Sequence, residues 1–169
     1  MRALIILFIL IFSNTAFTQS KVEWLTFEEA LLRNKLEQKQ FMIDIYTDWC
    51  TWCKKMDKTT FSDPKVAEYI NENYYAVKLN GESHHEFQFQ GSSFTEEELA
   101  ALLLNGNMSF PSTVFIWVKG DENLQANPLP VPGYQSKDKM HLILSFMHEA
   151  AYEGVSFEDY KIEYKSPYF

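Results

Sequence analysis

Two cysteines are the residues of this chain with the clearest capacity for chemistry. Cys50 and Cys53 are the only cysteines in the sequence, and the spacing between them is Cys-x-x-Cys. They follow the apolar run 41–46 and precede a segment with a helical pattern, which places the first thiol at the start of a helix. Unpaired backbone N–H groups and the helix dipole favour a thiolate there. Such a thiolate is a nucleophile, and the second thiol is near enough to form a disulfide with it.

Three other roles for the cysteine pair are open. A structural disulfide across a four-residue loop stabilises little, because the entropy that it removes from the unfolded chain grows with loop length. A structural zinc site needs four ligands, and only His84 and His85 could complete one here. Buried inert thiols need no pattern around them. The position of the pair between a strand and a helix favours redox chemistry over all three.

The strand before the motif carries one unexpected residue. Residues 41–46 have the pattern of a buried strand, apolar on both faces except for Asp44. A buried carboxyl group without a charge partner is unfavourable when ionised and tends to hold its proton. Asp44 therefore either contradicts the predicted strand or has a functional role.

The N-terminus has the pattern of a secretory signal peptide. Met1 and Arg2 precede the apolar residues 3–12, and small and polar residues follow at 13–19. The apolar segment is too short for a comfortable transmembrane helix. We therefore expect residues 1–18 to direct export to the periplasm or the medium, where disulfides persist; a membrane anchor formed by an uncleaved signal is the alternative.

Length and composition indicate one compact domain with an acidic surface. The chain has 169 residues, of which 46% are hydrophobic and 16% aromatic, and its formal net charge is −8. This charge argues against nucleic acid as a partner, because phosphate binding needs clustered Lys and Arg. The sequence does not indicate an oligomeric state.

Strand and helix patterns alternate along the chain, which predicts one α/β domain over residues 19–152 with a C-terminal extension at 153–169. Capping boxes begin helices at Thr26 and Thr95, and Asp63 caps another helix. In the helix after Thr95, we expect the leucines to face inward: Leu99, Leu102 and Leu103. The expected strands are 21–24, 41–46, 74–79, 113–118 and the edge strand 129–131; the other expected features are a helix at 50–58, a hairpin or insertion at 81–94, a turn at 120–123 and a last long helix ending near 151.

The C-terminal extension is aromatic and charged. It is expected to form a short helix and strand that cover the domain, since aromatic residues more often pack than bind; a partner-binding segment is the alternative.

This arrangement resembles the thioredoxin superfamily over about residues 22–152. The resemblance rests on Trp-Cys-x-x-Cys after the first core strand and on Phe110-Pro111 before a later strand. Within the superfamily the chain is similar to the C-terminal thioredoxin-like domains of DsbD-type bacterial disulfide reductases, on residues 44–50, 53–54 and 60–64. The resemblance implies a thioredoxin-like fold, with a central mixed β-sheet flanked by helices.

The resemblance also implies roles for individual residues. Cys50 matches the exposed attacking cysteine, and Cys53 matches the resolving cysteine. Asp44 matches the buried acid that relays a proton to or from the resolving thiol. Pro111 matches the cis-proline, which presents the backbone of the preceding residue, here Phe110, to an incoming peptide.

The function expected from these matches is that of an exported thiol–disulfide oxidoreductase which reduces protein disulfides. Trp49 and Trp52 are expected to flank the site as apolar substrate-binding surface, although Trp49 could equally pack against the sheet. No cofactor other than the Cys50–Cys53 disulfide is expected, no metal site is expected, and a membrane-embedded electron donor would supply electrons.

Thr51-Trp52 replaces the Gly-Pro of ordinary thioredoxins, so the direction of electron flow is open. The alternatives are a disulfide oxidase or isomerase, a non-catalytic peptide-binding module and a metal chaperone.

Overall fold

The computed structural model describes residues 21–118, 127–151 and 153–168. The expected signal peptide and the expected turn at 120–123 lie outside these residues. Within them the chain forms the following elements in order: β1 (Trp24–Leu25), α1 (Phe27–Asn34), β2 (Gln40–Tyr46), α2 (Thr51–Met56), the π-helical turn η1 (Asp57–Phe61), α3 (Pro64–Asn73), β3 (Tyr74–Asn80), β4 (Glu86–Phe89), β5 (Ser92–Thr95), α4 (Glu96–Leu103), β6 (Ser112–Ile116), β7 (Leu129–Pro132), α5 (Lys137–Glu149) and α6 (Phe157–Glu163).

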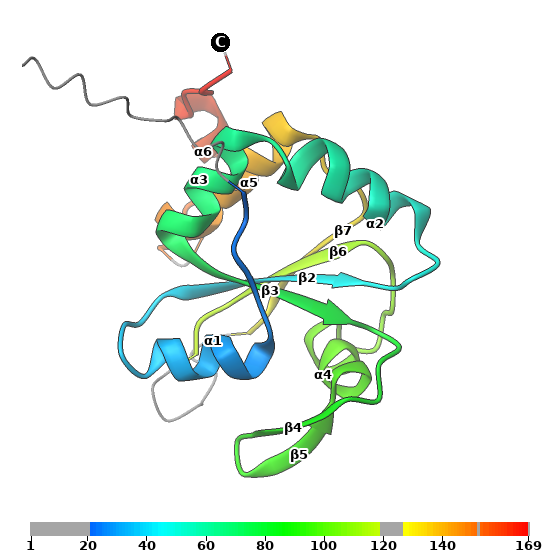
Figure 1. The fold of residues 1–169 in the computed structure, drawn as a ribbon. Coiled ribbons are helices and arrows are strands. Elements are labelled where there is room, and N and C mark those ends of the chain that lie inside the picture. Colours follow the sequence, from blue (N-terminus) through cyan, green and yellow to red (C-terminus); the bar gives the residue numbers. More distant parts are fainter. Residues whose placement is uncertain (1–20, 119–126, 152, 169) are drawn as a thin grey trace, which may run out of the picture.

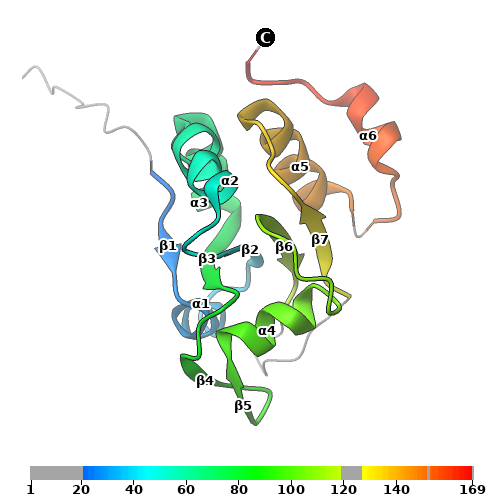
Figure 2. The ribbon, with the colours of Figure 1, turned by 90° about the vertical axis from the view of Figure 1, so that its right-hand side faces the viewer.

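Five of the strands form one mixed sheet in the order β1-β3-β2-β6-β7 (Figure 2). Strands β1, β3 and β2 are parallel, and β6 and β7 run antiparallel to their neighbours. The predicted α/β fold with a mixed central sheet is confirmed. Strand β7 lies at one edge of the sheet, as its prolines predicted. Strand β1 begins three residues later than the expected strand at 21–24.

Helices cover both faces of the sheet (Figure 1). Alternate residues of β2 divide between two cores, because successive side chains of a strand point to opposite faces. Met42 packs in the core beneath α2, α3 and α5, whereas Ile43 packs in the core beneath α1 and α4. Strand β2 is therefore buried on both faces, which explains its nearly continuous apolar sequence.

The predicted helix starts are confirmed by their capping contacts. Thr26 and Thr95 each form a complete capping box with the glutamate three residues later. Asp63 caps α3 and accepts hydrogen bonds from the backbone N–H groups of Lys65 and Val66.

The inward orientation expected for Leu102 is wrong. Its side chain is 46% exposed, whereas Leu99, Ala100 and Leu103 are fully buried. The buried face of α4 follows positions i, i+1 and i+4, and Leu102 lies outside that stripe.

The segment between β3 and α4 folds as the antiparallel hairpin β4–β5, which was one of its two expected forms. Phe87 and Phe89 of this hairpin place their ring centroids 5.4 and 5.1 Å from that of Phe27 on α1. The hairpin thereby extends the core on the α1 and α4 face.

The C-terminal extension packs against the opposite face. Phe157 and Tyr160 of α6 contact Phe146 of α5, with ring centroids 5.2 and 5.6 Å apart. The extension covers the domain as predicted, but in the described residues it forms a helix without the expected strand.

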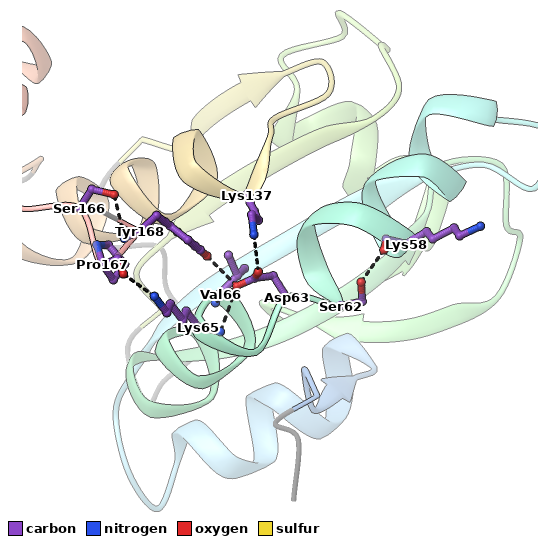
Figure 3. Close-up of polar contacts among 9 residues, drawn as sticks. All are labelled: Lys58, Ser62, Asp63, Lys65, Val66, Lys137, Ser166, Pro167 and Tyr168. Carbon is purple, nitrogen blue, oxygen red and sulfur yellow. Dashed lines mark hydrogen bonds and ion pairs between the residues drawn. The ribbon is translucent and has the colours of Figure 1, made fainter. Parts of the chain in front are cut away.

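Residues 166–168 reach the start of α3 (Figure 3). The Tyr168 hydroxyl donates a hydrogen bond of 2.6 Å to Asp63, and Lys65 donates one to the carbonyl of Pro167. The Lys137 ammonium lies 3.1 Å from the same carboxylate. These contacts tie the last described residues to the start of α3, whose cap residue Asp63 also pairs with the first residue of α5.

Candidate active site

Four loops meet at one edge of the sheet. The parallel strands β2 and β3 end there, β6 begins there, and β7 ends opposite the start of β6, since Ser112 pairs with Pro132. The Cys-x-x-Cys motif, the segment Gly81–Ser83, the Phe110-Pro111 peptide and Tyr134 are therefore close in space although distant in sequence.

The cysteine pair forms the start of α2. Cys50 and Cys53 are joined by a disulfide, with their Cα atoms 5.3 Å apart. Cys50 is the N-cap residue, and its sulfur accepts a hydrogen bond of 3.0 Å from the backbone N–H of Cys53. A donor aimed at this sulfur favours its thiolate in the reduced form.

The expected exposure of Cys50 is wrong for this oxidised state. Both cysteines are only 3% exposed. The reason is the orientation of the Cys50 sulfur, which is bonded to Cys53 and turned toward the backbone of the helix start. The neighbouring tryptophans form the accessible surface instead.

One aromatic pair lies on the side of the site formed by the end of β3. Trp49 is 65% exposed, and its ring stands edge-on to Phe110 at a centroid distance of 6.0 Å. Its indole Nε1 donates to the Glu82 carboxylate, 3.0 and 2.9 Å from the two oxygens. The Phe110–Pro111 peptide bond is cis, as the resemblance implied.

A second aromatic pair lies on the side formed by the end of β7. Trp52 is 54% exposed, and its ring centroid is 5.5 Å from that of Tyr134. The Lys55 ammonium lies over both rings, at 4.4 and 5.1 Å. Tyr134 was not predicted from the sequence, because only the pairing of β7 with β6 brings it to the site. A hydrogen bond of 2.8 Å from the N–H of the preceding residue, Gly133, to the Pro111 carbonyl holds this segment beside the cis-proline.

Asp44 is buried as predicted, but it has a charge partner. Its side chain is 2% exposed, and one carboxylate oxygen lies 2.6 Å from the Lys78 ammonium. The other oxygen has no hydrogen-bond partner among the described residues. Lys78 also pairs with the exposed Asp57 at the start of η1. The strand register, which sets Asp44 opposite Lys78, is the signal that sequence reasoning lacked.

Burial and charge act in opposite directions on this pair. Burial raises the pKa of Asp44 above its usual range, and the nearby Lys78 ammonium opposes that rise. Burial also acts to lower the pKa of Lys78, but the carboxylates of Asp44 and Asp57 outweigh it and raise that pKa. The site thus contains a buried carboxyl group that holds its proton to higher pH than an ordinary carboxyl does.

The two loop histidines do not converge on the cysteines. His84 lies 3.4 Å from Glu97, and His85 lies 3.1 Å from Glu28. No cluster of three or more metal-ligating side chains occurs in the described part of the chain.

A family comparison matches most of the chain. The sequence profile of the family described as "Thioredox_DsbH: Protein of unknown function, DUF255" matches residues 14–153. The chain belongs to this family.

Curated proteins that are similar in sequence to this chain are named as disulfide-exchange proteins. The chain is 38% identical over 68 residues to the "Thiol:disulfide interchange protein DsbD" of Photorhabdus laumondii, a match that covers 36% of this chain and 12% of that protein. The protein of the same name from Salmonella typhi is 28% identical over 88 residues, which covers 52% of this chain and 14% of the relative. The chain therefore spans only a small part of the length of these relatives.

Solved structures share the fold. The structure titled "DsbH Oxidoreductase" has a TM-score of 0.56 at 18% identity and covers 78% of this chain and 87% of its own. A thioredoxin-fold protein from Helicobacter pylori has a TM-score of 0.58 at 19% identity, with coverage of 75% and 80%. These likenesses show a thioredoxin-like fold, which confirms the expected fold class.

Fold, family and site support the same chemistry. The Cys-x-x-Cys pair at the start of α2, the cis-proline and the DsbD-like sequence together support a thiol–disulfide oxidoreductase.

None of the helices in residues 21–118, 127–151 and 153–168 is long and apolar enough to span a membrane.

Proposed function

We propose that this protein is an exported thiol–disulfide oxidoreductase that reduces disulfides in other proteins. The observation that carries the proposal is the position of Cys50, whose sulfur caps α2 and accepts the Cys53 N–H. Such a donor stabilises a nucleophilic thiolate, whereas a structural disulfide gains nothing from it.

The reaction begins from the dithiol form. The Cys50 thiolate attacks one sulfur of a substrate disulfide, a mixed disulfide forms, and the other substrate sulfur leaves as a thiolate. Cys53 then loses its proton and attacks the Cys50 sulfur. This step forms the Cys50–Cys53 disulfide and releases the second substrate thiolate, so that two electrons pass from the protein to the substrate.

Asp44 is the proposed proton acceptor for Cys53. Its side chain points to the sheet face that α2 covers, because Asp44 lies two residues after Met42 on the same face of β2, and Met42 packs beneath that helix. Because burial raises the pKa of Asp44, this pKa lies nearer to the pKa of a thiol than the pKa of an exposed aspartate does. Lys78 holds the carboxylate in place at 2.6 Å.

We propose that the segment Phe110-Pro111, just before β6, recognises the substrate peptide. We propose that the backbone of Phe110 pairs strand-like with a substrate peptide, while the exposed side chains of Trp49 and Trp52 provide apolar surface on either side. Return of the Cys50–Cys53 disulfide to the dithiol form requires an electron donor, for which we propose a membrane-embedded reductase. Residues 1–18 are the proposed export signal.

The equilibrium reduction potential of the Cys50–Cys53 pair tests the direction of the reaction. It is measured in glutathione or dithiothreitol buffers, with reduction of insulin by the dithiol form as the activity readout. A potential near the roughly −270 mV of thioredoxin supports a reductase. A potential near the roughly −120 mV of DsbA would replace this proposal with an oxidase or isomerase.

A further inference from the structure

Two charged side chains of opposite sign flank the disulfide. Glu82 accepts a hydrogen bond from Trp49, whose ring packs against Phe110. Lys55 lies over both rings of the aromatic pair of Trp52 and Tyr134. We call the first group the Glu82 side and the second the Lys55 side.

The order of the strands separates these two sides. Glu82 follows β3 and Tyr134 follows β7, whereas the motif follows β2, which lies between them in the order β1-β3-β2-β6-β7. An extended peptide that crosses the disulfide from the β3 side to the β7 side would meet the Glu82 side with one end and the Lys55 side with the other.

The Glu82 side is closely packed. A Cβ atom on Gly81 would lie 2.7 Å from Phe110 Cε1, so only glycine lets the chain pass this ring without displacing it. The next residue, Glu82, is exposed, and both of its carboxylate oxygens lie within hydrogen-bond distance of Trp49 Nε1. This geometry fixes a negative charge at the rim of the site.

The Lys55 side is held by its own contacts. The Lys55 ammonium over two rings is a cation–π arrangement, and the Tyr134 hydroxyl lies 3.0 Å from Thr59 Oγ1. Lys55 is itself exposed, so a positive charge is fixed on this side of the disulfide.

We propose that Glu82 and Lys55 determine substrate specificity by charge. This inference rests on the proposed function and names its substrate class: an extended peptide whose disulfide cysteine has a basic residue toward the Glu82 side and an acidic residue toward the Lys55 side. Complementary charges at the rim of an interface raise association rates and reject wrong orientations, because like charges meet when the peptide is reversed.

Two peptides of equal composition test the proposal. One carries Arg-Cys-Glu and the other Glu-Cys-Arg, each with its cysteine in a disulfide with the chromophore 2-nitro-5-thiobenzoate. Attack by reduced Cys50 on the peptide sulfur releases the chromophore. At low salt we expect the wild-type protein to prefer one peptide by at least about threefold, a size typical of exposed charges. High salt should abolish the preference because it screens exposed charges.

Charge variants assign the preference to the two residues. The double variant Glu82→Lys/Lys55→Glu is expected to prefer the other peptide, and Glu82→Gln and Lys55→Gln are each expected to reduce the wild-type ratio. Lys54→Gln is the matched control, since Lys54 is the exposed neighbour of Lys55 and shows no ring contact in the described residues. It should keep the ratio. Because both peptides react with the same Cys50 thiol in each variant, the ratio does not depend on any change in the reactivity of that thiol.

Equal rates for the two peptides at low salt, or an unchanged preference in the double variant, would overturn the charge selection while leaving the oxidoreductase intact. Failure of the reduced wild type to release chromophore from either peptide would instead overturn the proposed function, and this inference with it.

Discussion

The ammonium group of Lys78 lies 2.6 Å from the carboxylate of Asp44 on the neighbouring strand, in the interior of the sheet face that carries the disulfide. The same ammonium reaches the exposed Asp57. The pair therefore connects a buried carboxyl group to the protein surface, and it supports Asp44 as a proton acceptor that can exchange its proton with solvent.

Replacing Asp44 tests this role. We expect Asp44→Asn to lower kcat for insulin reduction by roughly tenfold at neutral pH, because general-base assistance to Cys53 is lost. Because burial raises the folded pKa of Asp44, its contribution to stability is fully present below the unfolded value of 3.8 and is lost as pH rises through the folded pKa. The variant should therefore be as stable as the wild type or more stable at pH 7, by up to about 1 kcal/mol, or 2–4 °C in Tm. Unchanged kinetics would remove Asp44 from the mechanism.

The two cysteines should differ in what their serine variants do. Cys50→Ser is expected to abolish insulin reduction, because the attacking sulfur is gone. Cys53→Ser should accumulate a mixed disulfide with substrate, because no thiol remains to resolve it. Mass spectrometry of alkylated protein detects the adduct. An equal yield of adduct from the two variants would contradict the assigned order of attack.

The close contact between Gly81 and Phe110 predicts the effect of a single methyl group. Gly81→Ala should displace the Phe110 ring, destabilise the protein by about 1–3 kcal/mol and raise KM for peptide substrates. Urea denaturation and steady-state kinetics measure the two effects. Adding Phe110→Leu should restore part of the stability, since the smaller side chain makes room; an equal loss in both backgrounds would place the strain elsewhere.

The contact between α5 and the C-terminal extension should depend on pH. Burial lowers the pKa of His141, and its Nδ1 lies 2.7 Å from the Tyr164 hydroxyl. Nearby charges act on it in both directions, with Asp63 and Glu149 raising the pKa and Lys65 lowering it. Neutral His141 therefore stabilises the folded state at pH values above its unfolded pKa of 6.5. This stabilisation is lost as the pH falls through the folded pKa of His141.

Hydrogen exchange of α6 measures this dependence. Protection of its amides should fall between pH 7 and pH 5 after correction for intrinsic rates, and His141→Gln should remove the difference. Equal protection at both pH values in the wild type would show that His141 does not control the contact.

Local signals made much of the fold predictable from the sequence. Capping boxes, the Asp63-Pro64 start and the apolar run 41–46 each act within a few residues, so their structures follow from the nearby sequence. The helix after the motif was predicted to end near Lys58, but helical turns continue through η1 to Phe61.

The long-range contacts around the disulfide could not be predicted, because they join residues that only the arrangement of the strands brings together. Lys78 is 34 residues from Asp44, and Glu82 is 33 residues from Trp49. The sequence indicated which residues surround the cysteines locally, namely Trp49 and Trp52. It did not indicate which charges those side chains would meet.

The prolines of β7 have a consequence for how molecules of this protein meet one another. Pro130 and Pro132 have no backbone N–H, and they lie in β7, one of the two edge strands of the five-stranded sheet. A neighbouring copy cannot use those positions to extend the sheet across molecules, which is a common route to aggregation. Backbone pairing between two copies through these positions of β7 should therefore be disfavoured even when the protein is concentrated.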